Sequence, residues 1–265
     1  MTTLPLIPNY PAIDLHCHFN SGALGDVQPT KNHFRDLPFF QKTYQRLNIL
    51  ASVQTTYPSV MRSDGIYEEN LRLQEMTRTT ENLFQWAVLD PRQPALFLQV
   101  ADLLKTDKVL GIKIHSDNHR YSILEYGDAI FSFANDHHAT VVMHPDRIAD
   151  MVAFADKYPH MRLIIAHLNN EEHVEAMMAA KHQNIYTDTS GGASVRNNAL
   201  EYAVEHVGAD RIFFGTDSYA VPFQKGRILL SSISEEDKQK ILLGNALRCF
   251  PKLDAWLNRQ TELPY

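Results

Sequence analysis

The sequence predicts a (β/α)8 TIM barrel, an α/β fold in which eight parallel strands are surrounded by helices. Two observations predict it. Short apolar segments alternate with longer amphipathic segments along the whole chain, and no linker or change of composition interrupts them. Such alternation implies a mostly parallel sheet, and eight units in roughly 250 residues fit the size of this barrel. We therefore expect one domain over residues 1–265.

The eight expected strands are bounded by polar residues, Pro or Gly, and most are rich in β-branched or aromatic residues. They are residues 12–19, 49–57, 83–91, 109–116, 139–146, 162–169, 184–191 and 211–218. The main alternative is a doubly wound open sheet with two or three of these strands misassigned. No stretch matches the glycine-rich dinucleotide fingerprint, which counts against that alternative.

The segments between the strands have the pattern of amphipathic helices. In the last of them, Ser234 can cap the first turn, and acidic residues that suit the helix dipole follow it. Leu242, Ala246 and Phe250 then fall on one face, and Pro251 ends the helix.

Composition limits the classes of partner. The 265 residues are 44% hydrophobic, enough for one large core, and the net charge of -6 without a basic block argues against a nucleic-acid partner. The chain start lacks the features of a secretory signal, and no apolar run is long enough to span a bilayer. Two distant cysteines, Cys17 and Cys249, suit a reducing cytoplasm. We expect a cytoplasmic protein that binds a small molecule.

The first expected strand, AIDLHCHF, carries two histidines two residues apart. Alternate side chains of a strand share a face, so Asp14, His16 and His18 would lie together. The opposite face would carry the remaining side chains, Ile13, Leu15 and Cys17. Two imidazoles on one face can reach one point, so the strand has either a solvated polar face or half of a metal site.

Further polar residues follow the apolar runs of other strands. They are Lys113 and His115 after the fourth strand, His144 after the fifth, His167 after the sixth and Asp217 after the eighth. Barrel enzymes place their chemistry at this end of the strands. Imidazole and carboxylate together suit zinc, manganese, iron or cobalt, and three imidazoles with one carboxylate leave room for a catalytic water.

The other eight of the 13 histidines fall in expected helices or loops, where we expect solvated or partly buried surface positions. They are His33, His119, His137, His138, His160, His173, His182 and His206.

These motifs together resemble the amidohydrolase superfamily. The D-x-H-x-H pattern, the histidines that end two strands and the Asp of GTDS carry the resemblance, with VLDPR (88–92), GIKIH (111–115) and ILLGNALRCF (241–250) as further similarities. The chain is most similar to the amidohydrolase-2 branch, which is related to aminocarboxymuconate-semialdehyde decarboxylase and lactonases. The resemblance covers nearly the whole chain.

The resemblance implies a role for each residue. His16, His18, His144 and Asp217 would bind a divalent metal, zinc first and manganese second, with one ion favoured over two. Asp217 and His167 would be catalytic, and Asp14 would support the histidines. In a two-metal site, His167 would bind the second ion and a carbamylated Lys113 would bridge both. Alternatively, the Lys113 amine pairs with Asp217 or with a substrate carboxylate.

The resemblance implies a metal-dependent hydrolase that opens a lactone, amide or ester with a metal-activated water. The alternative is a non-oxidative decarboxylase with the same metal site. A non-catalytic barrel, a nuclease of the TatD type and a metal-free lactonase are less favoured by the residues present. The branch also suggests a homo-oligomer.

Substrate-binding residues would come from the loops after the strands. His115, Arg120 and Arg147 are the main candidates, because a cation or imidazole at the rim suits a carboxylate-bearing substrate. Other loop candidates are Arg92, His119, Tyr121, Asn169, Ser190 and Tyr219. The stretch 19–40, with Gly22 and Gly25, is a candidate lid.

Overall fold

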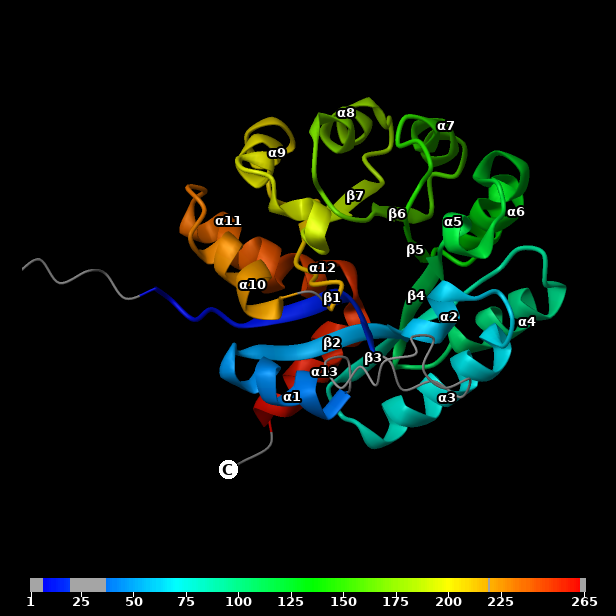
Figure 1. The fold of residues 1–265 in the computed structure, drawn as a ribbon, viewed down its shortest axis with the longest axis horizontal. Coiled ribbons are helices and arrows are strands. Elements are labelled where there is room, and N and C mark those ends of the chain that lie inside the picture. The colour runs from blue at the N-terminus through cyan, green and yellow to red at the C-terminus, as the bar shows by residue number, and fades with distance from the viewer. Residues whose placement is uncertain (1–6, 20–36, 219, 263–265) are drawn as a thin grey trace, which may run out of the picture.

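Eight parallel strands form one sheet in the order β1 to β8 (Figure 1). The computed structural model describes residues 7–19, 37–218 and 220–262. The strands are β1 Ala12–Phe19, β2 Ile49–Thr56, β3 Leu83–Val88, β4 Val109–Ile114, β5 Thr140–Met143, β6 Arg162–Ile165, β7 Ile185–Asp188 and β8 Ile212–Phe213. Every neighbouring pair is parallel. The prediction of a (β/α)8 barrel is confirmed.

The sheet curls until its last strand meets its first. The backbone N–H of Leu15 donates to the carbonyl of Phe214 at 3.0 Å, and the N–H of Thr216 donates to the carbonyl of His16 at 3.0 Å. These bonds continue β8 along β1 and bring the first and last thirds of the chain together. Residues after β8 therefore lie directly beside the histidines of β1.

Helices surround the strands (Figure 1). They are α1 Leu37–Arg46, α2 Tyr57–Met61, α3 Ile66–Thr79, α4 Pro94–Leu103, α5 Ser116–His119, α6 Ile123–Asp136, α7 Asp150–Lys157, α8 Glu171–Ala179, α9 Ala199–Val207, α10 Val221–Leu229, α11 Glu235–Gln239, α12 Asn245–Cys249 and α13 Pro251–Glu262, with a 3-10 turn at Gly192–Val195 and a π-helical turn at Lys240–Gly244. Within the described residues, no helix is both long and apolar enough to cross a membrane.

Most expected strands extend past the observed ones at their carboxyl ends. β6 ends at Ile165 and β8 at Phe213, so His167 and Asp217 lie in loops just beyond them. Both residues have positive φ, 67° for His167 and 53° for Asp217. A left-handed residue cannot belong to a pleated strand, which is why His167 and Asp217 lie in loops.

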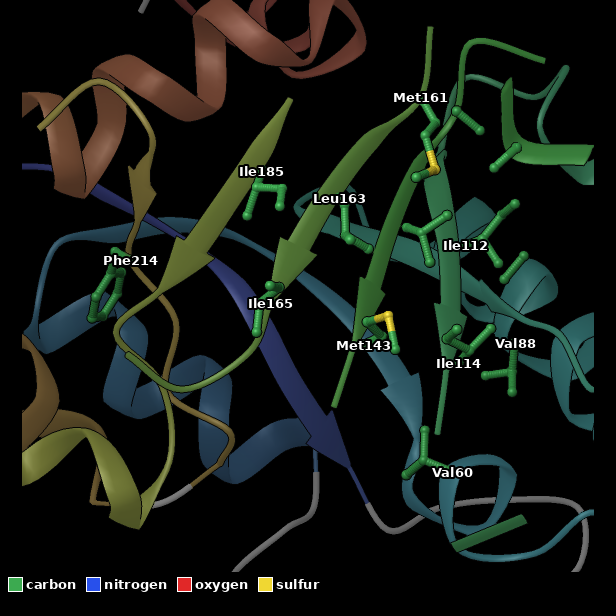
Figure 2. Close-up of a cluster of buried hydrophobic side chains, with 14 of the residues drawn as sticks. Val60, Val88, Ile112, Ile114, Met143, Met161, Leu163, Ile165, Ile185 and Phe214 are labelled. Atoms are coloured by element: carbon green, nitrogen blue, oxygen red, sulfur yellow. The ribbon is translucent and has the colours of Figure 1, made fainter. Parts of the chain in front are cut away.

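Two apolar layers hold the barrel together. The interior layer joins side chains from seven strands with residues of the last helices, which only the inside of a closed sheet allows. It includes Ile13, Leu15, Val53, Phe84, Trp86, Val142, Ile164, Phe213, Phe250, Leu253 and Trp256. The outer layer packs strands against helices, as Figure 2 shows for residues such as Ile112, Met143 and Ile165. The interior layer lies toward the amino ends of the strands.

The regular alternation expected along β1 is wrong. The register against β2 pairs Asp14 with Ser52 but Cys17 with Gln54, so β1 holds one extra residue between them. Such a β-bulge reverses the side-chain parity. Ile13 and Leu15 therefore face the interior layer, and so do His16 and His18 beyond the bulge. Asp14, Cys17 and Phe19 face the outer layer.

Asp14 consequently supports the strands rather than an imidazole. Its carboxylate accepts hydrogen bonds from Tyr44 of α1 at 2.8 Å and from the Thr216 hydroxyl at 2.6 Å. Burial raises its pKa to about 6, although these donors oppose the shift. Asp14 thus ties β1 to α1 and to the segment after β8. Cys17 is buried on the same outer side, as expected.

The expected helix over residues 234–250 forms as one helical stretch, residues 235–249, with a π-helical turn in its middle. Ser234 does cap it, and its hydroxyl accepts from the N–H of Asp237 at 3.1 Å. The π-helical turn then inserts a residue between α11 and α12. Leu242 accordingly joins the outer layer, whereas Phe250 joins the interior layer. Pro251 follows the end of α12 and begins α13.

Two histidines expected near the surface are fully buried. His119 Nε2 lies 3.0 Å from the carbonyl of Ser59, and His173 Nε2 lies 3.1 Å from the carbonyl of Ala166. Each ring can donate to a backbone acceptor, which permits its burial. Of the others, His137, His138, His160, His182 and His206 are exposed, and His33 lies outside the described residues.

Candidate metal centre and active site

Six of the predicted site residues meet at the carboxyl end of the barrel. They are His16 and His18 from β1, Lys113 from β4, and His144, His167 and Asp217 from the loops after β5, β6 and β8. The candidate ligand atoms of His16, His144 and His167 all lie within 4.8 Å of one another, as do those of His16, His18 and Asp217. His16 belongs to both groups and therefore lies at the centre of the cluster.

Both ring nitrogens of His16 have partners. Nδ1 lies 2.9 Å from Oδ2 of Asp188 and 3.0 Å from the hydroxyl of Ser190. Nε2 lies 2.8 Å from Nζ of Lys113. Because Asp188 presents a carboxylate on one side and Lys113 an amine on the other, the consistent arrangement has a proton on Nδ1 and a lone pair on Nε2.

His18 lies between Thr55 of β2 and Asp217. Its Nδ1 is 2.5 Å from Oγ1 of Thr55, and its Nε2 is 3.2 Å from Oδ1 of Asp217. A hydroxyl can donate or accept, so Thr55 orients the ring without fixing its tautomer. Burial lowers the pKa of His18 to about 3, despite the opposing effect of Asp217. The ring is therefore neutral and can act as a ligand.

His144 and His167 face each other through their Nε2 atoms, which are 2.7 Å apart. The Nδ1 of His167 lies 3.0 Å from the carbonyl of Ser190, which can only accept, so this nitrogen carries the proton and Nε2 a lone pair. The Nδ1 of His144 is buried and has no hydrogen-bond partner among the described residues. Burial holds the pKa of His144 well below its usual range.

These observations show that the donor set fits a divalent cation. Four imidazoles and one carboxylate converge, and nitrogen and oxygen donors of this kind suit zinc, manganese or iron. His16, His18, His144 and Asp217 can hold such an ion, with His167 adjacent.

Two carboxylates stay ionised within this buried cluster. Burial raises the pKa of Asp217, but a hydrogen bond from His18 and the nearby histidines lower it more, so the net pKa lies well below its usual range. The pKa of Asp188 is likewise lowered overall, through His16, His167 and Ser190, against the effect of burial. The cluster therefore carries negative charge that a cation can balance.

Lys113 is fully buried beside these carboxylates. Burial lowers its pKa to about 8, and Asp217 and Asp188 partly oppose this shift. An amine with a pKa near neutrality can be protonated or neutral at physiological pH. The position is therefore compatible with both sequence-based interpretations of Lys113, the ammonium and the carbamate.

Two glycines allow the cluster to close. A Cβ on Gly191, which has a φ of 76°, would lie 2.6 Å from Nδ1 of His167. A Cβ on Gly215 would lie 2.9 Å from Cβ of His16 and 3.0 Å from Cβ of Ser190. Any side chain at these positions would displace an imidazole. The glycine of GTDS is thus required by the close approach of β8 to β1.

A cavity of about 170 Å³ opens onto the cluster. Its walls combine residues of the histidine cluster with side chains of α2 and α5. They are His18, Tyr57, Val60, Met61, His115, Asn118, His144, His167 and Asp217. His115 stacks on His144, with ring centroids 4.4 Å apart, and caps α5 by accepting from the N–H of Asn118 at 3.4 Å. Of the three main substrate-binding candidates, His115 lines this cavity.

The other two candidates lie elsewhere. Arg120 is exposed at the end of α5 and has a φ of 60°. Arg147 is 73% exposed and lines a separate cavity between α7 and α8. Of the further candidates, Arg92 is held by Asp90 and by the carbonyl of His119, and Ser190 is buried behind His16. Tyr219 and residues 20–36 of the expected lid lie outside the described residues, and residues 37–40 begin α1.

Sequence reasoning missed Asp188, the most central of the unpredicted residues. Asp188 ends β7, so the rule that selected the polar residues after five other strands applies equally to it. The stretch TDTSG, residues 187–191, carried this signal. Thr55 and Tyr57 were also missed, because nothing in the sequence places the end of β2 against His18.

Comparison with known proteins agrees with this architecture. A sequence model of the amidohydrolase family matches residues 13–252. A dihydroxybenzoic acid decarboxylase from Polaromonas sp. JS666, solved with bound manganese and the inhibitor 2-nitroresorcinol, has a TM-score of 0.74 at 18% identity, over 97% of this chain and 100% of that one. No curated protein matches the chain.

Two further solved structures share the fold. The 5-carboxyvanillate decarboxylase from Sphingomonas paucimobilis has a TM-score of 0.72 at 13% identity, over 91% of this chain and 99% of that one. A putative 2-pyrone-4,6-dicarboxylic acid hydrolase from Pseudomonas putida has a TM-score of 0.65 at 17% identity, over 92% of this chain and 98% of that one.

Eight parallel strands with histidines and carboxylates at their carboxyl end define a (β/α)8 barrel with a candidate metal site. The family match extends over nearly all of this barrel. The chain belongs to the amidohydrolase family, and the resemblance found in its sequence is confirmed.

Proposed function

We propose that the chain is a metal-dependent lyase that removes carbon dioxide from a small aromatic or unsaturated carboxylic acid without an oxidant. The observation that carries this proposal is the cluster of four imidazoles with Asp217 and Lys113, on a barrel similar to those of two decarboxylases. The cavity supports a small substrate, because it is smaller than the ~300–1,000 Å³ of typical drug-sized sites.

The residues present suit this reaction. A divalent cation held by His16, His18, His144 and Asp217 would supply positive charge for substrate oxygens. Asp217 is ionised, so it can accept the proton of a substrate hydroxyl and return it to the carbon that loses the carboxyl group. The electron pair of the broken carbon–carbon bond stays on that carbon until the proton arrives, and carbon dioxide leaves.

The walls of the cavity support the same reaction. Val60 and Met61 offer an apolar surface on which a flat ring can pack. Buried Lys113 places positive charge near the developing negative charge in a site with little water. Each effect favours a charge that spreads from a carboxylate into a ring.

Hydrolysis, the activity first expected from the sequence, is the second candidate. The likeness to a putative pyrone dicarboxylic acid hydrolase favours it. Asp217 would then take a proton from water and pass it to the leaving group. The same residues serve both reactions, so the products must distinguish them.

The deciding experiment incubates the protein with hydroxybenzoates and with lactones in 18O-labelled water. Release of carbon dioxide with no 18O in the remaining organic product supports the lyase. If 18O appears in a new carboxyl group and no carbon dioxide is released, the chain is a hydrolase and the lyase proposal is wrong. The variant His144→Ala should lose metal and either activity together, which separates the enzyme from a contaminant.

We further propose one ion per chain, zinc before manganese. The carboxylate and imidazole donors suit both metals, and the amine of Lys113 beside Nε2 of His16 supports a single ion. Plasma mass spectrometry of untagged protein purified without chelator tests this. Two equivalents would instead support a carbamylated Lys113 bridge, and no metal after incubation would contradict the proposal.

A further inference from the structure

Residues at the end of β7 contact the two central histidines, His16 and His167, on the side away from the centre of the cluster. Asp188 and Ser190 both contact Nδ1 of His16, and Ser190 also contacts Nδ1 of His167. The two rings stack with centroids 5.1 Å apart and planes 12° apart. The Nε2 atoms of both rings consequently point away from β7 and into the cluster. One short segment therefore controls two imidazoles.

The hydrogen-bond directions within this segment follow from its donors and acceptors. Ser190 donates its hydroxyl proton to Oδ1 of Asp188, so its oxygen can only accept from the two rings. The backbone N–H groups of His167 and Ser190 also donate to Oδ1 of Asp188, at 3.3 and 2.9 Å. Only Oδ2 remains for Nδ1 of His16, at 2.9 Å.

We propose that Asp188 is a positioning residue that keeps the proton of His16 on Nδ1 and thereby leaves Nε2 free to bind the metal. This inference rests on the proposed metal site. It does not extend to His167, whose Nδ1 proton is already fixed by the carbonyl of Ser190. His18 Nδ1 faces a hydroxyl, and His144 Nδ1 has no hydrogen-bond partner within the described part of the chain, so neither is fixed in this way.

The proposal has a physical basis in metal sites generally. A carboxylate behind a ligating histidine orients the ring, fixes its tautomer and increases its basicity, and its loss typically weakens metal binding by about 10–100-fold. Asp188 is buried, which keeps water from replacing it as an acceptor. Its effect should therefore lie toward the upper part of that range.

The test compares Asp188→Asn with the matched control Asp90→Asn. The amide retains one oxygen, which the two backbone N–H groups and the Ser190 hydroxyl hold in place, so its NH2 group would face Nδ1 of His16. Asp90 is also a buried carboxylate just beyond a strand, but it binds Arg92 instead of a histidine. The same substitution there should leave the metal site unchanged.

Zinc and cobalt affinities are measured by chelator competition, with the absorption spectrum of the cobalt-loaded protein as a second readout. We expect Asp188→Asn to weaken binding about 10–100-fold and to change the cobalt spectrum, while Asp90→Asn matches the wild type. Affinity within about threefold of the wild type for Asp188→Asn overturns the inference.

The tautomers are read independently in metal-free protein by 15N NMR of the histidine rings. In the wild type, both His16 and His167 should carry the proton on Nδ1. In Asp188→Asn, His16 should lose this preference and His167 should keep it; an unchanged His16 overturns the inference. If the wild type binds no metal, the proposed function fails, and this tautomer comparison still decides the role of Asp188.

Discussion

The two ends of the barrel bury different kinds of side chain. The amino end is filled by apolar side chains such as Trp86, Phe250 and Leu253. The carboxyl end buries Lys113 and Asp188 with the histidines. Apolar burial stabilises a fold by about 25 cal/mol per Å², whereas buried charge costs free energy unless it is paired. Stability and chemistry are thus separated along the barrel axis. Substitutions at the amino end should mainly lower stability, and substitutions at the carboxyl end should mainly lower activity.

The largest effect on activity is expected from Asp217→Asn. An amide cannot accept and return the proton, so turnover should fall by about 10²–10⁴-fold. The thermal midpoint should change little, because the amide has nearly the same shape. Steady-state kinetics and a thermal scan of metal-loaded protein measure both. A metal-loaded variant with wild-type turnover would contradict the role of Asp217.

The largest effect on stability is expected at the opposite end, from Phe250→Ala. Phe250 packs against Trp86 and Phe213, with ring centroids 5.6 and 5.9 Å away. Its removal should lower the free energy of unfolding by about 3–5 kcal/mol, measured by urea titration. Turnover per folded molecule should not change.

The matched control for that substitution is Phe223→Ala, whose side chain is 55% exposed. Its effect on the free energy of unfolding should stay within about 0.5 kcal/mol. Similar losses for Phe250 and Phe223, or a loss of metal in Phe250→Ala, would show that the two ends are not separate.

A smaller, pH-dependent effect is expected from Asp14→Asn. The pKa of Asp14 is about 6 in the folded protein and 3.8 for the unperturbed group, so the folded state binds more protons between these values. Its contribution to stability is therefore present at low pH and is lost as pH rises through 6. The variant should gain stability relative to the wild type between pH 4 and 7, by up to about 3 kcal/mol.

Urea titrations of both proteins in chelator give this difference at each pH, and groups common to both proteins cancel. A difference that stays constant from pH 4 to 7 would show that Asp14 is ionised throughout. The hydrogen bonds that its carboxylate accepts would then outweigh its burial.

The smallest effect is expected from Arg147→Ala. The guanidinium is exposed, lies 3.9 Å from Asp150 and lines a cavity other than the one at the histidines. The free energy of unfolding should change by less than about 1 kcal/mol, and KM should stay near the wild-type value. A large rise in KM would show that Arg147 binds the substrate after all.

The fold and the inner histidines could be predicted from the sequence because they depend on local patterns. β1 has the predicted bounds, Ala12–Phe19, and polar residues after apolar runs located His144, His167 and Asp217. Asp188 obeyed the same rule and was overlooked. Burial of His119 and His173 could not be foreseen, because it depends on carbonyls of Ser59 and Ala166 that tertiary packing supplies.

The bulge in β1 was equally invisible to pattern reasoning. The segment reads as a regular alternation, and an extra residue changes the parity without changing the composition. The π-helical turn at Lys240–Gly244 was not predicted for the same reason. Periodicity identifies an element but does not reveal where it skips a residue.

Because of that bulge, the number of residues in β1 matters as much as their identities. It lets Ile13 and Leu15 fill the apolar end while His16 and His18 reach the metal end of the same barrel. If the same eight residues alternated regularly with Ile13 and Leu15 inside, both imidazoles would point outward toward the helices. Elsewhere in β1, a residue inserted or deleted would shift the later side chains to the other face, whereas a substitution changes a single side chain, so β1 should tolerate substitutions more readily than changes of length.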